Sequence, residues 1–237
     1  MEVFSQPLGS GRMFDRIAPR YDALNRILSL GMDVGWRRAA VAAVGLEAGD
    51  AGLDVATGTA DLAIALARAT PGARIVALDP SSAMLTLGAR KVAEGGLAAR
   101  VACTRGDAQA LPFPSGGFAG ATIAFGIRNV PDRGRALREM ARVVRPGGRV
   151  VVLELNEVQS GVLAPAVRLW TRQMVPRIGA WLSGAREYRY LQESVAVFPP
   201  AGEFAALMRA SGLAVRSVRP LGFGACTLFV GEVVEPA

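Results

Sequence analysis

Residues 53–67, LDVATGTADLAIALA, indicate a buried strand that passes through a glycine-bearing turn into an amphipathic helix. The turn holds one glycine, Gly58, where dinucleotide-binding loops of the G-x-G-x-x-G type place three, because Ala60 and Ala63 fill the other two positions. Ligands of open α/β sheets bind beyond the carboxyl ends of the strands. The stretch therefore predicts a cofactor loop that lacks most of the amide cradle a diphosphate would need.

Apolar runs and helical patterns alternate from residue 51 to about residue 155. The runs are residues 51–56, 73–79, 99–107, 118–126 and 147–155, and the helical patterns between them are 60–69, 80–96 and 131–148. Ser81 or Ser82 is a candidate cap of the second helix, and the third is expected to start near Asp132 and to stop at Pro146-Gly147-Gly148. Continuous apolar strands separated by helices are typical of a parallel sheet covered on both faces.

The rest of the chain extends this α/β, doubly wound, Rossmann-like core. We expect one domain with a helical cap (1–45), a cofactor-binding core (50–156), a helical insertion that meets the acceptor (157–199), and a closing helix and strand pair (200–237). The insertion contains an amphipathic segment, 161–182, interrupted by Pro165 and Pro176.

Composition narrows the function. About half of the 237 residues are hydrophobic, no apolar run reaches the length of a membrane span, and the N-terminus lacks a secretory pattern, so we expect a cytoplasmic globular protein. Two cysteines and no histidine argue against a zinc site, and we expect no metal. The net charge of +7 comes from arginines that are scattered rather than clustered, with Lys91 as the only lysine, so no nucleic-acid partner is expected.

Acidic residues follow three successive strands. Asp79 lies 21 residues after Gly58, where a carboxylate can accept hydrogen bonds from two ribose hydroxyls; its alternative role is a cap or turn residue before Pro80. Asp107 is placed to accept from an adenine amino group, and Ala108 to offer its backbone amide.

The weak glycine fingerprint favours S-adenosylmethionine over a dinucleotide, because this cofactor has no phosphate and carries a sulfonium and an ammonium. Asp54, or the backbone from Ala56 to Gly58, is expected near that ammonium. The alanines of the turn could adopt left-handed dihedrals only at a cost. Thr57, Thr59, Pro80, Met84 and Phe125 complete the predicted cofactor contacts.

The chain resembles the menaquinone/ubiquinone biosynthesis C-methyltransferase family over nearly its whole length. The matching stretches are MFDRIAPRYDALNRILSLGMDVGWRR, LDVATGTADLA, ALDPSSAMLTLGARK, GDAQALPFPSGGF, FGIRNVPDRGRALREMARVVRPGGRVVVLEL and PRIGAWLSGAREYRYLQESV. The resemblance implies a seven-stranded sheet with an antiparallel final strand, S-adenosylmethionine as methyl donor (leaving as S-adenosylhomocysteine), and a polyprenyl quinol as acceptor. By matching motif it assigns cofactor contacts to Thr59, Asp79, Asp107 and Ala108.

The sequence departs from the family pattern at several positions. Ala60 replaces a second glycine of the turn, and Ala124 replaces a serine that many members carry. Family-typical histidines are absent near Phe198 and in the run Leu228-Phe229-Val230-Gly231.

Methylating a quinol ring carbon requires a phenolate-like nucleophile held in line with the methyl group. Arg128 is the candidate electrostatic stabiliser, Asn129 the candidate for orienting the quinol oxygen, and Tyr21 the candidate for closing over the methyl donor. The alternatives are an ion pair with a carboxylate for Arg128, a helix cap for Asn129, and packing for Tyr21. Asp33 is a further acidic candidate on the cap.

Trp170, Met174 and Trp181, with arginines among them, are expected either to line an isoprenoid groove or to pack in the core. A lipophilic acceptor would bring the protein to the inner face of the membrane as a peripheral contact, and a homodimer is compatible with the sequence. Two other functions fit the same features: methylation of another lipid or phenolic acceptor, and a cofactor-binding scaffold without catalysis.

Overall fold

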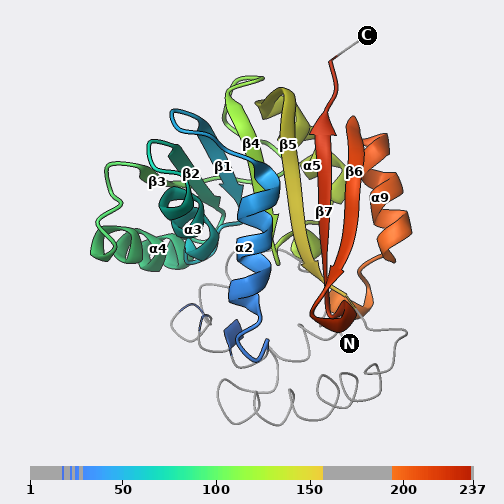
Figure 1. The fold of residues 1–237 in the computed structure, drawn as a ribbon, viewed down its shortest axis with the longest axis horizontal. Coiled ribbons are helices and arrows are strands. Elements are labelled where there is room, and N and C mark those ends of the chain that lie inside the picture. Colours follow the sequence, from blue (N-terminus) through green and yellow to red (C-terminus); the bar gives the residue numbers. More distant parts are fainter. Residues whose placement is uncertain (1–17, 19–21, 23–24, 27–28, 157–193, 236–237) are drawn as a thin grey trace, which may run out of the picture.

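The fold was analysed in a computed structural model, which describes residues 18, 22, 25–26, 29–156 and 194–235. Seven strands form one sheet in the order β3-β2-β1-β4-β5-β7-β6 (Figure 1). The strands are β1 (Ala51–Val55), β2 (Arg74–Asp79), β3 (Val101–Arg105), β4 (Phe118–Ala124), β5 (Val144–Leu155), β6 (Leu213–Leu221) and β7 (Cys226–Val233). β1 to β5 pair in parallel, and β7 lies antiparallel between β5 and β6. The predicted doubly wound sheet with an antiparallel final strand is confirmed.

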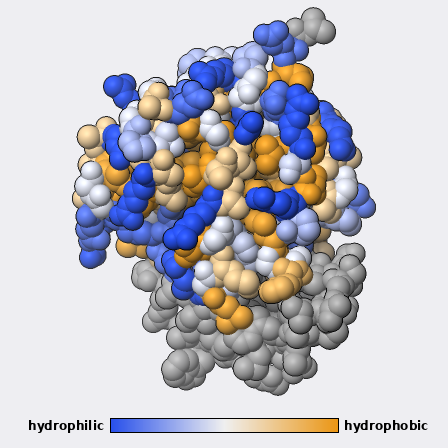
Figure 2. Space-filling view, in the orientation of Figure 1, coloured by the Kyte–Doolittle hydropathy of each residue, from blue (hydrophilic) through white to orange (hydrophobic). Residues whose placement is uncertain are grey.

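Helices cover both faces of this sheet. One core contains residues of α2 (Asp33–Val44), α3 (Asp61–Ala69) and α4 (Ser82–Glu94), and the other contains residues of α5 (Arg133–Val143) and α9 (Ala201–Ala210). Successive residues of β5 alternate between the two cores: Val150 and Val152 belong to the second, Val151 and Leu153 to the first. α2 crosses in front of the centre of the sheet (Figure 1), and on this face hydrophilic side chains lie scattered among apolar ones (Figure 2).

Sequence signals at the start of two helices are confirmed. Ser81 caps α4, since its hydroxyl accepts a hydrogen bond from the backbone N–H of Met84 at 3.2 Å. Asp132 caps α5 by accepting from the N–H of Arg135 at 2.8 Å.

The predicted end of the third helix is wrong. α5 ends at Val143, and Val144 already has extended dihedrals and pairs with Phe118 of β4. Pairing resumes at Arg149 opposite Gly120, so residues 145–148 bulge out of the ladder. The buried Val144 favours the sheet, and Gly147, with φ of +75°, allows the sharp turn that the bulge requires.

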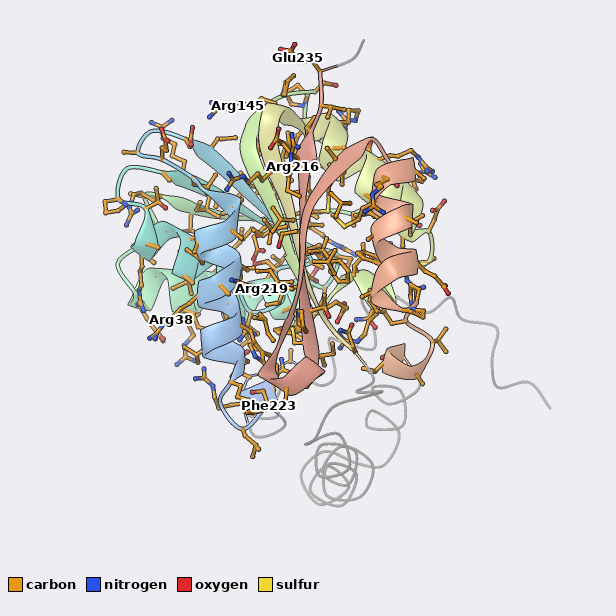
Figure 3. All side chains as sticks on the ribbon, turned by 45° about the vertical axis from the view of Figure 1, so that its right-hand side comes forward. Arg38, Arg145, Arg216, Arg219, Phe223 and Glu235 are labelled. Atoms are coloured by element: carbon orange, nitrogen blue, oxygen red, sulfur yellow. The ribbon has the colours of Figure 1, made fainter. Side chains whose placement is uncertain are left out.

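A short 3-10 turn, η3 (Gly222–Gly224), joins β6 to β7 and fixes the position of α2. A Cβ at Gly222 would lie 2.4 Å from Cζ2 of Trp36, so the tryptophan ring on α2 packs directly against this turn. Phe223, with φ of +58°, points away from the sheet at the same turn and is exposed (Figure 3).

Candidate active site

The turn between β1 and α3 lies at the carboxyl edge of the parallel strands and is built from left-handed backbone. Ala56, Gly58 and Ala60 have φ of +51°, +58° and +64°. The two alanines thus adopt the conformation that costs an L-residue about 1–2 kcal/mol relative to the right-handed region. The turn is held by the N–H of Thr57, which donates to the carbonyl of Leu78 on β2 at 3.0 Å. Strain of this kind concentrates at functional sites where the surrounding structure enforces it.

Asp54 supports the turn from beneath. Its buried carboxylate accepts hydrogen bonds from the hydroxyls of Thr57 at 2.6 Å and Thr122 at 2.7 Å. Burial raises the pKa of Asp54 to about 6, although these hydrogen bonds and the charge of Arg37 act in the opposite direction. A negative charge held here would attract the ammonium of an amino-acid ligand, as would the backbone carbonyls of the turn.

Asp79 joins the turn to the end of β2. Its Oδ2 accepts from the N–H of Gly58 at 2.8 Å, and its Oδ1 accepts from the N–H of Ser81 at 2.8 Å. These bonds hold the Asp79 carboxylate at the end of β2, next to the β1–α3 turn. The structure thus contains the turn role of Asp79, and its ribose contact stays a prediction.

The other predicted cofactor residues occupy the neighbouring strand ends. Asp107 lies beyond β3, where its Oδ1 accepts from the N–H of Gln109 at 2.9 Å, and Ala108 is buried behind it. Pro80 is exposed after β2, and Met84 is buried in the first turn of α4.

A shallow cleft lies beside the β1–α3 turn, and its volume of about 340 Å³ includes the open solvent at its mouth. Asp79 and Asp107, with the residues next to them, do not line it. It is bounded by the β1–α3 turn, the start of α3, the end of β4 and one side chain from α2. Its lining residues are Arg37, Asp54, Ala56, Thr57, Gly58, Thr59, Asp61, Leu62, Ala124 and Phe125. Phe125, a predicted contact, also has positive φ, at +57°.

Arg128 and Asn129 lie just beyond β4 in the 3-10 turn η1 (Ile127–Asn129), and both are buried. The Arg128 guanidinium forms an ion pair with Glu154 of β5 and donates to the carbonyl of Phe125 at 2.8 Å. The backbone N–H of Arg128 donates to the same Glu154 carboxylate at 3.1 Å. The structure thus contains the ion pair that was the alternative role of this arginine.

A second group of charges connects the N-terminal segment to α3 and α4. Lys91 of α4 donates to Asp22 at 2.8 Å, to the Thr59 hydroxyl at 3.1 Å and to Asp61. Thr59 in turn donates to Asp22 at 2.5 Å. We call Asp22, Thr59, Asp61 and Lys91 the N-terminal latch.

Sequence reasoning missed Arg37 and the latch. Asp22 and Lys91 are 69 positions apart, and neither stands in a pattern that indicates a pair. The pair of arginines at 37 and 38 gave no sign of which one faces the cleft. Asp33, the acidic candidate on the cap, is buried and bonded to Arg37 and to the Ser29 hydroxyl, so its partners are on the cap itself.

The positions where the family carries histidine lie in the hydrophobic core. Phe198 packs against Phe204, with ring centroids 4.9 Å apart, and Leu228 and Phe229 are buried in the two cores. None of these side chains lines the cleft.

Tyr21, Trp170, Met174 and Trp181 lie outside the described residues. Within the described ranges, no helix is long and apolar enough to cross a membrane, and no group of three or more potential ligand side chains could hold a metal ion.

The sheet order, the acidic strand ends and the cleft at the β1–α3 turn define a class I S-adenosylmethionine-dependent methyltransferase fold. Solved structures agree with this class. The chain superposes on an S-adenosylmethionine-dependent methyltransferase from Aquifex aeolicus with a TM-score of 0.63 at 17% identity, covering 84% of this chain and 89% of the other. It superposes on the cyclase SpnF with a TM-score of 0.71 at 18% identity, covering 97% of each chain. Because a cyclase shares the fold, these similarities establish architecture and not the reaction.

The chain belongs to the ubiE/COQ5 methyltransferase family, whose model matches residues 5–232. It is 44% identical over 221 residues to the ubiquinone/menaquinone biosynthesis C-methyltransferase UbiE of Geobacter sulfurreducens, covering 93% of this chain and 86% of the relative. It is 45% identical to the demethylmenaquinone methyltransferase of Thermus thermophilus, covering 93% and 99%. The predicted family, the methyltransferase activity and S-adenosylmethionine as methyl donor are confirmed.

Proposed function

We propose that this protein transfers a methyl group from S-adenosylmethionine to a ring carbon of demethylmenaquinol or a closely related polyprenyl quinol. The family match over almost the whole chain carries the proposal, because relatives with this name share 45% of its residues over 93% of its length. The carboxylates and the turn at the strand ends fit the proposed methyl donor.

Different groups of described residues would bind the methyl donor and face the acceptor. Asp79 and Asp107 would hold the ribose and the adenine, and the β1–α3 turn would hold the amino-acid end. Bound S-adenosylmethionine would supply an electrophilic methyl group attached to a sulfonium. Phe125 and Ala124, at the end of β4, line the side of the cleft that leads to η1.

Arg128 is assigned a positioning role in this proposal. Its ion pair with the fully buried Glu154 and its bond to the Phe125 carbonyl hold the left-handed turn after β4 in place. Asn129 follows in the same turn and remains the proposed contact of the quinol oxygen. The sequence has no histidine, so the ring proton would leave to a carboxylate, a tyrosine, water or an oxygen of the acceptor itself.

The test supplies the protein with methyl-labelled S-adenosylmethionine and demethylmenaquinone, with and without a reductant. We expect labelled menaquinone only from the reduced acceptor, since the oxidised ring lacks the electron-rich carbon that attacks the methyl group. A panel with a phospholipid amine and a polyketide-type phenol distinguishes the acceptors. Tight binding of S-adenosylhomocysteine without transfer to the reduced quinol would contradict the proposal.

We further propose that the protein is cytoplasmic, makes peripheral contact with the membrane that dissolves its acceptor, and can form a homodimer. Sedimentation with vesicles that contain demethylmenaquinone tests the peripheral membrane contact. Light scattering of the free protein tests the dimer.

A further inference from the structure

The amino-acid end of S-adenosylmethionine carries a carboxylate, and the acidic residues around the cleft cannot neutralise it. Asp54 and Asp61 line the cleft with negative charge. Among the described residues that line it, Arg37 is the only cation. A carboxylate placed in this cleft therefore has one complementary side chain.

Arg37 is held at the cleft by its neighbours on several elements. Trp36, the preceding residue, packs against the Gly222 turn and lies 6.2 Å from the Phe125 ring, centroid to centroid. The Arg37 guanidinium itself stands over the same Phe125 ring, 5.4 Å from its centroid. Its side chain is only 12% exposed. A cation held over an aromatic face and shielded from water is well placed to bind an anion with little ordering cost.

The hydrogen-bonding capacity of Arg37 is largely available. In the described part of the structure the guanidinium donates to Asp33, and its Nη2 lies 3.9 Å from Asp61, beyond hydrogen-bond distance. A guanidinium has about five N–H donors in a planar fork that matches a carboxylate. One bond to Asp33 therefore anchors the side chain and leaves donors for a ligand.

We infer that Arg37 binds the carboxylate of the cofactor's amino-acid end, so that α2 contributes to cofactor recognition. The inference rests on the proposed function, because it takes the methyl donor to be S-adenosylmethionine. It gives α2 a second role: the helix covers the sheet and also places the one cation of the described cleft opposite the β1–α3 turn.

Calorimetry with two ligands tests the inference. The ligands are S-adenosylhomocysteine and its decarboxylated analogue, which differ only by the carboxylate. Arg37→Leu should weaken binding of S-adenosylhomocysteine by about tenfold to hundredfold, the range expected for losing charged hydrogen bonds. Binding of the decarboxylated analogue should change by less than about threefold, because that ligand has no group for Arg37 to bind.

Two further variants act as controls. Arg38→Leu removes the adjacent, exposed arginine of α2 (Figure 3) and should leave both affinities unchanged. Arg37→Lys keeps the charge without the fork and should give an intermediate loss for S-adenosylhomocysteine alone. Arg37→Leu leaves the buried Asp33 with the Ser29 hydroxyl at 2.9 Å and the Arg26 Nε at 3.5 Å, so its thermal unfolding is measured before the affinities. Should that variant fail to fold, Arg37→Lys, which keeps a cation beside Asp33, carries the comparison of the two ligands.

If Arg37→Leu weakened the binding of both ligands equally, the inference would be overturned, and Arg37 would only maintain the structure of the cleft. Unchanged binding of S-adenosylhomocysteine would also overturn it. Normal binding by the wild-type protein without transfer to the quinol would contradict the proposed function and leave this result standing. A wild-type protein that binds neither ligand would overturn both.

Discussion

Replacing Arg128 by methionine should destabilise the protein strongly, because it leaves the Glu154 carboxylate buried without its partner. The two side chains are 6% and 0% exposed. Removing one member of a buried ion pair costs about 3–5 kcal/mol. Glu154 would still accept from the backbone N–H of Arg128 and from that of Leu155 at 2.8 Å, which favours the lower part of this range.

Thermal unfolding gives the first measurement. In a chain of this size 1 kcal/mol shifts the midpoint by roughly 2–4 °C, so Arg128→Met should lower it by about 6–20 °C. Glu154→Gln keeps an acceptor for the backbone and removes the charge. In the double variant neither charge remains buried alone, so its loss should fall short of the sum of the two single losses by about 2 kcal/mol or more.

The opposite result has a definite meaning. If Arg128→Met unfolded within about 1 kcal/mol of the wild type and still bound S-adenosylhomocysteine normally, yet lost all methyl transfer, the guanidinium would act on the acceptor. The ion pair with Glu154 would then not be its main contribution. Thiol labelling of Cys226 checks the same site independently. Burial is the larger cause and the charge of Glu154 the smaller cause that raise the pKa of this thiol, so it is unreactive in the intact fold.

Three further changes test the cleft and its surroundings. The pKa of Asp54 is raised from 3.8 to about 6, so its contribution to stability is fully present below about pH 4 and is lost as the pH rises through 6. Asp54→Asn should therefore remove up to about 3 kcal/mol of the fall in unfolding free energy between these pH values, measured by urea unfolding at each pH. An unchanged dependence on pH would exclude the carboxyl as its source. Gly126→Ala should cost about 1–3 kcal/mol, because its Cβ would lie 2.7 Å from that of Ala56, and adding Ala56→Gly should restore most of the loss; failure of this rescue would refute the contact. Lys91→Met should change stability by less than about 1 kcal/mol, as expected for partly exposed ion pairs, but should weaken S-adenosylhomocysteine binding, because it removes the cation that contacts both Asp22 and Thr59. Arg90→Met, which breaks only an exposed pair with Glu94, is the control, and equal effects of the two variants would contradict a role for the latch.

Local patterns predicted much of the fold. Continuous apolar runs placed the five parallel strands, and the cap residues Ser81 and Asp132 placed two helix starts, because these signals act over a few residues. The boundary of α5 was missed because an apolar residue at position 144 fits both a helix and a strand pattern. Its pairing with Phe118, which is distant in sequence, decides between them.

Candidate site residues that follow a strand could be predicted from the sequence. Contacts between segments that are distant in sequence could not. Asp79 and Asp107 were predicted from position alone, and the structure places Asp79 at the end of β2 and Asp107 two residues after β3. The partner of Arg128 lies 26 residues away at the end of β5, so spacing could not separate an ion pair from a catalytic role. The left-handed alanines show another limit: Ala56 and Ala60 adopt dihedrals that their residue type disfavours, because the surrounding bonds enforce them.

The latch also has a practical use that follows from the single lysine of the sequence. Amine-specific acylating reagents would find two kinds of target, the α-amino group and the Lys91 Nζ. An ammonium that contacts Asp22, Asp61 and Thr59 is held by these groups, so acylation at Lys91 should be slower than at an ammonium without such contacts. Mass spectrometry could therefore follow the contacts of the latch without an engineered label.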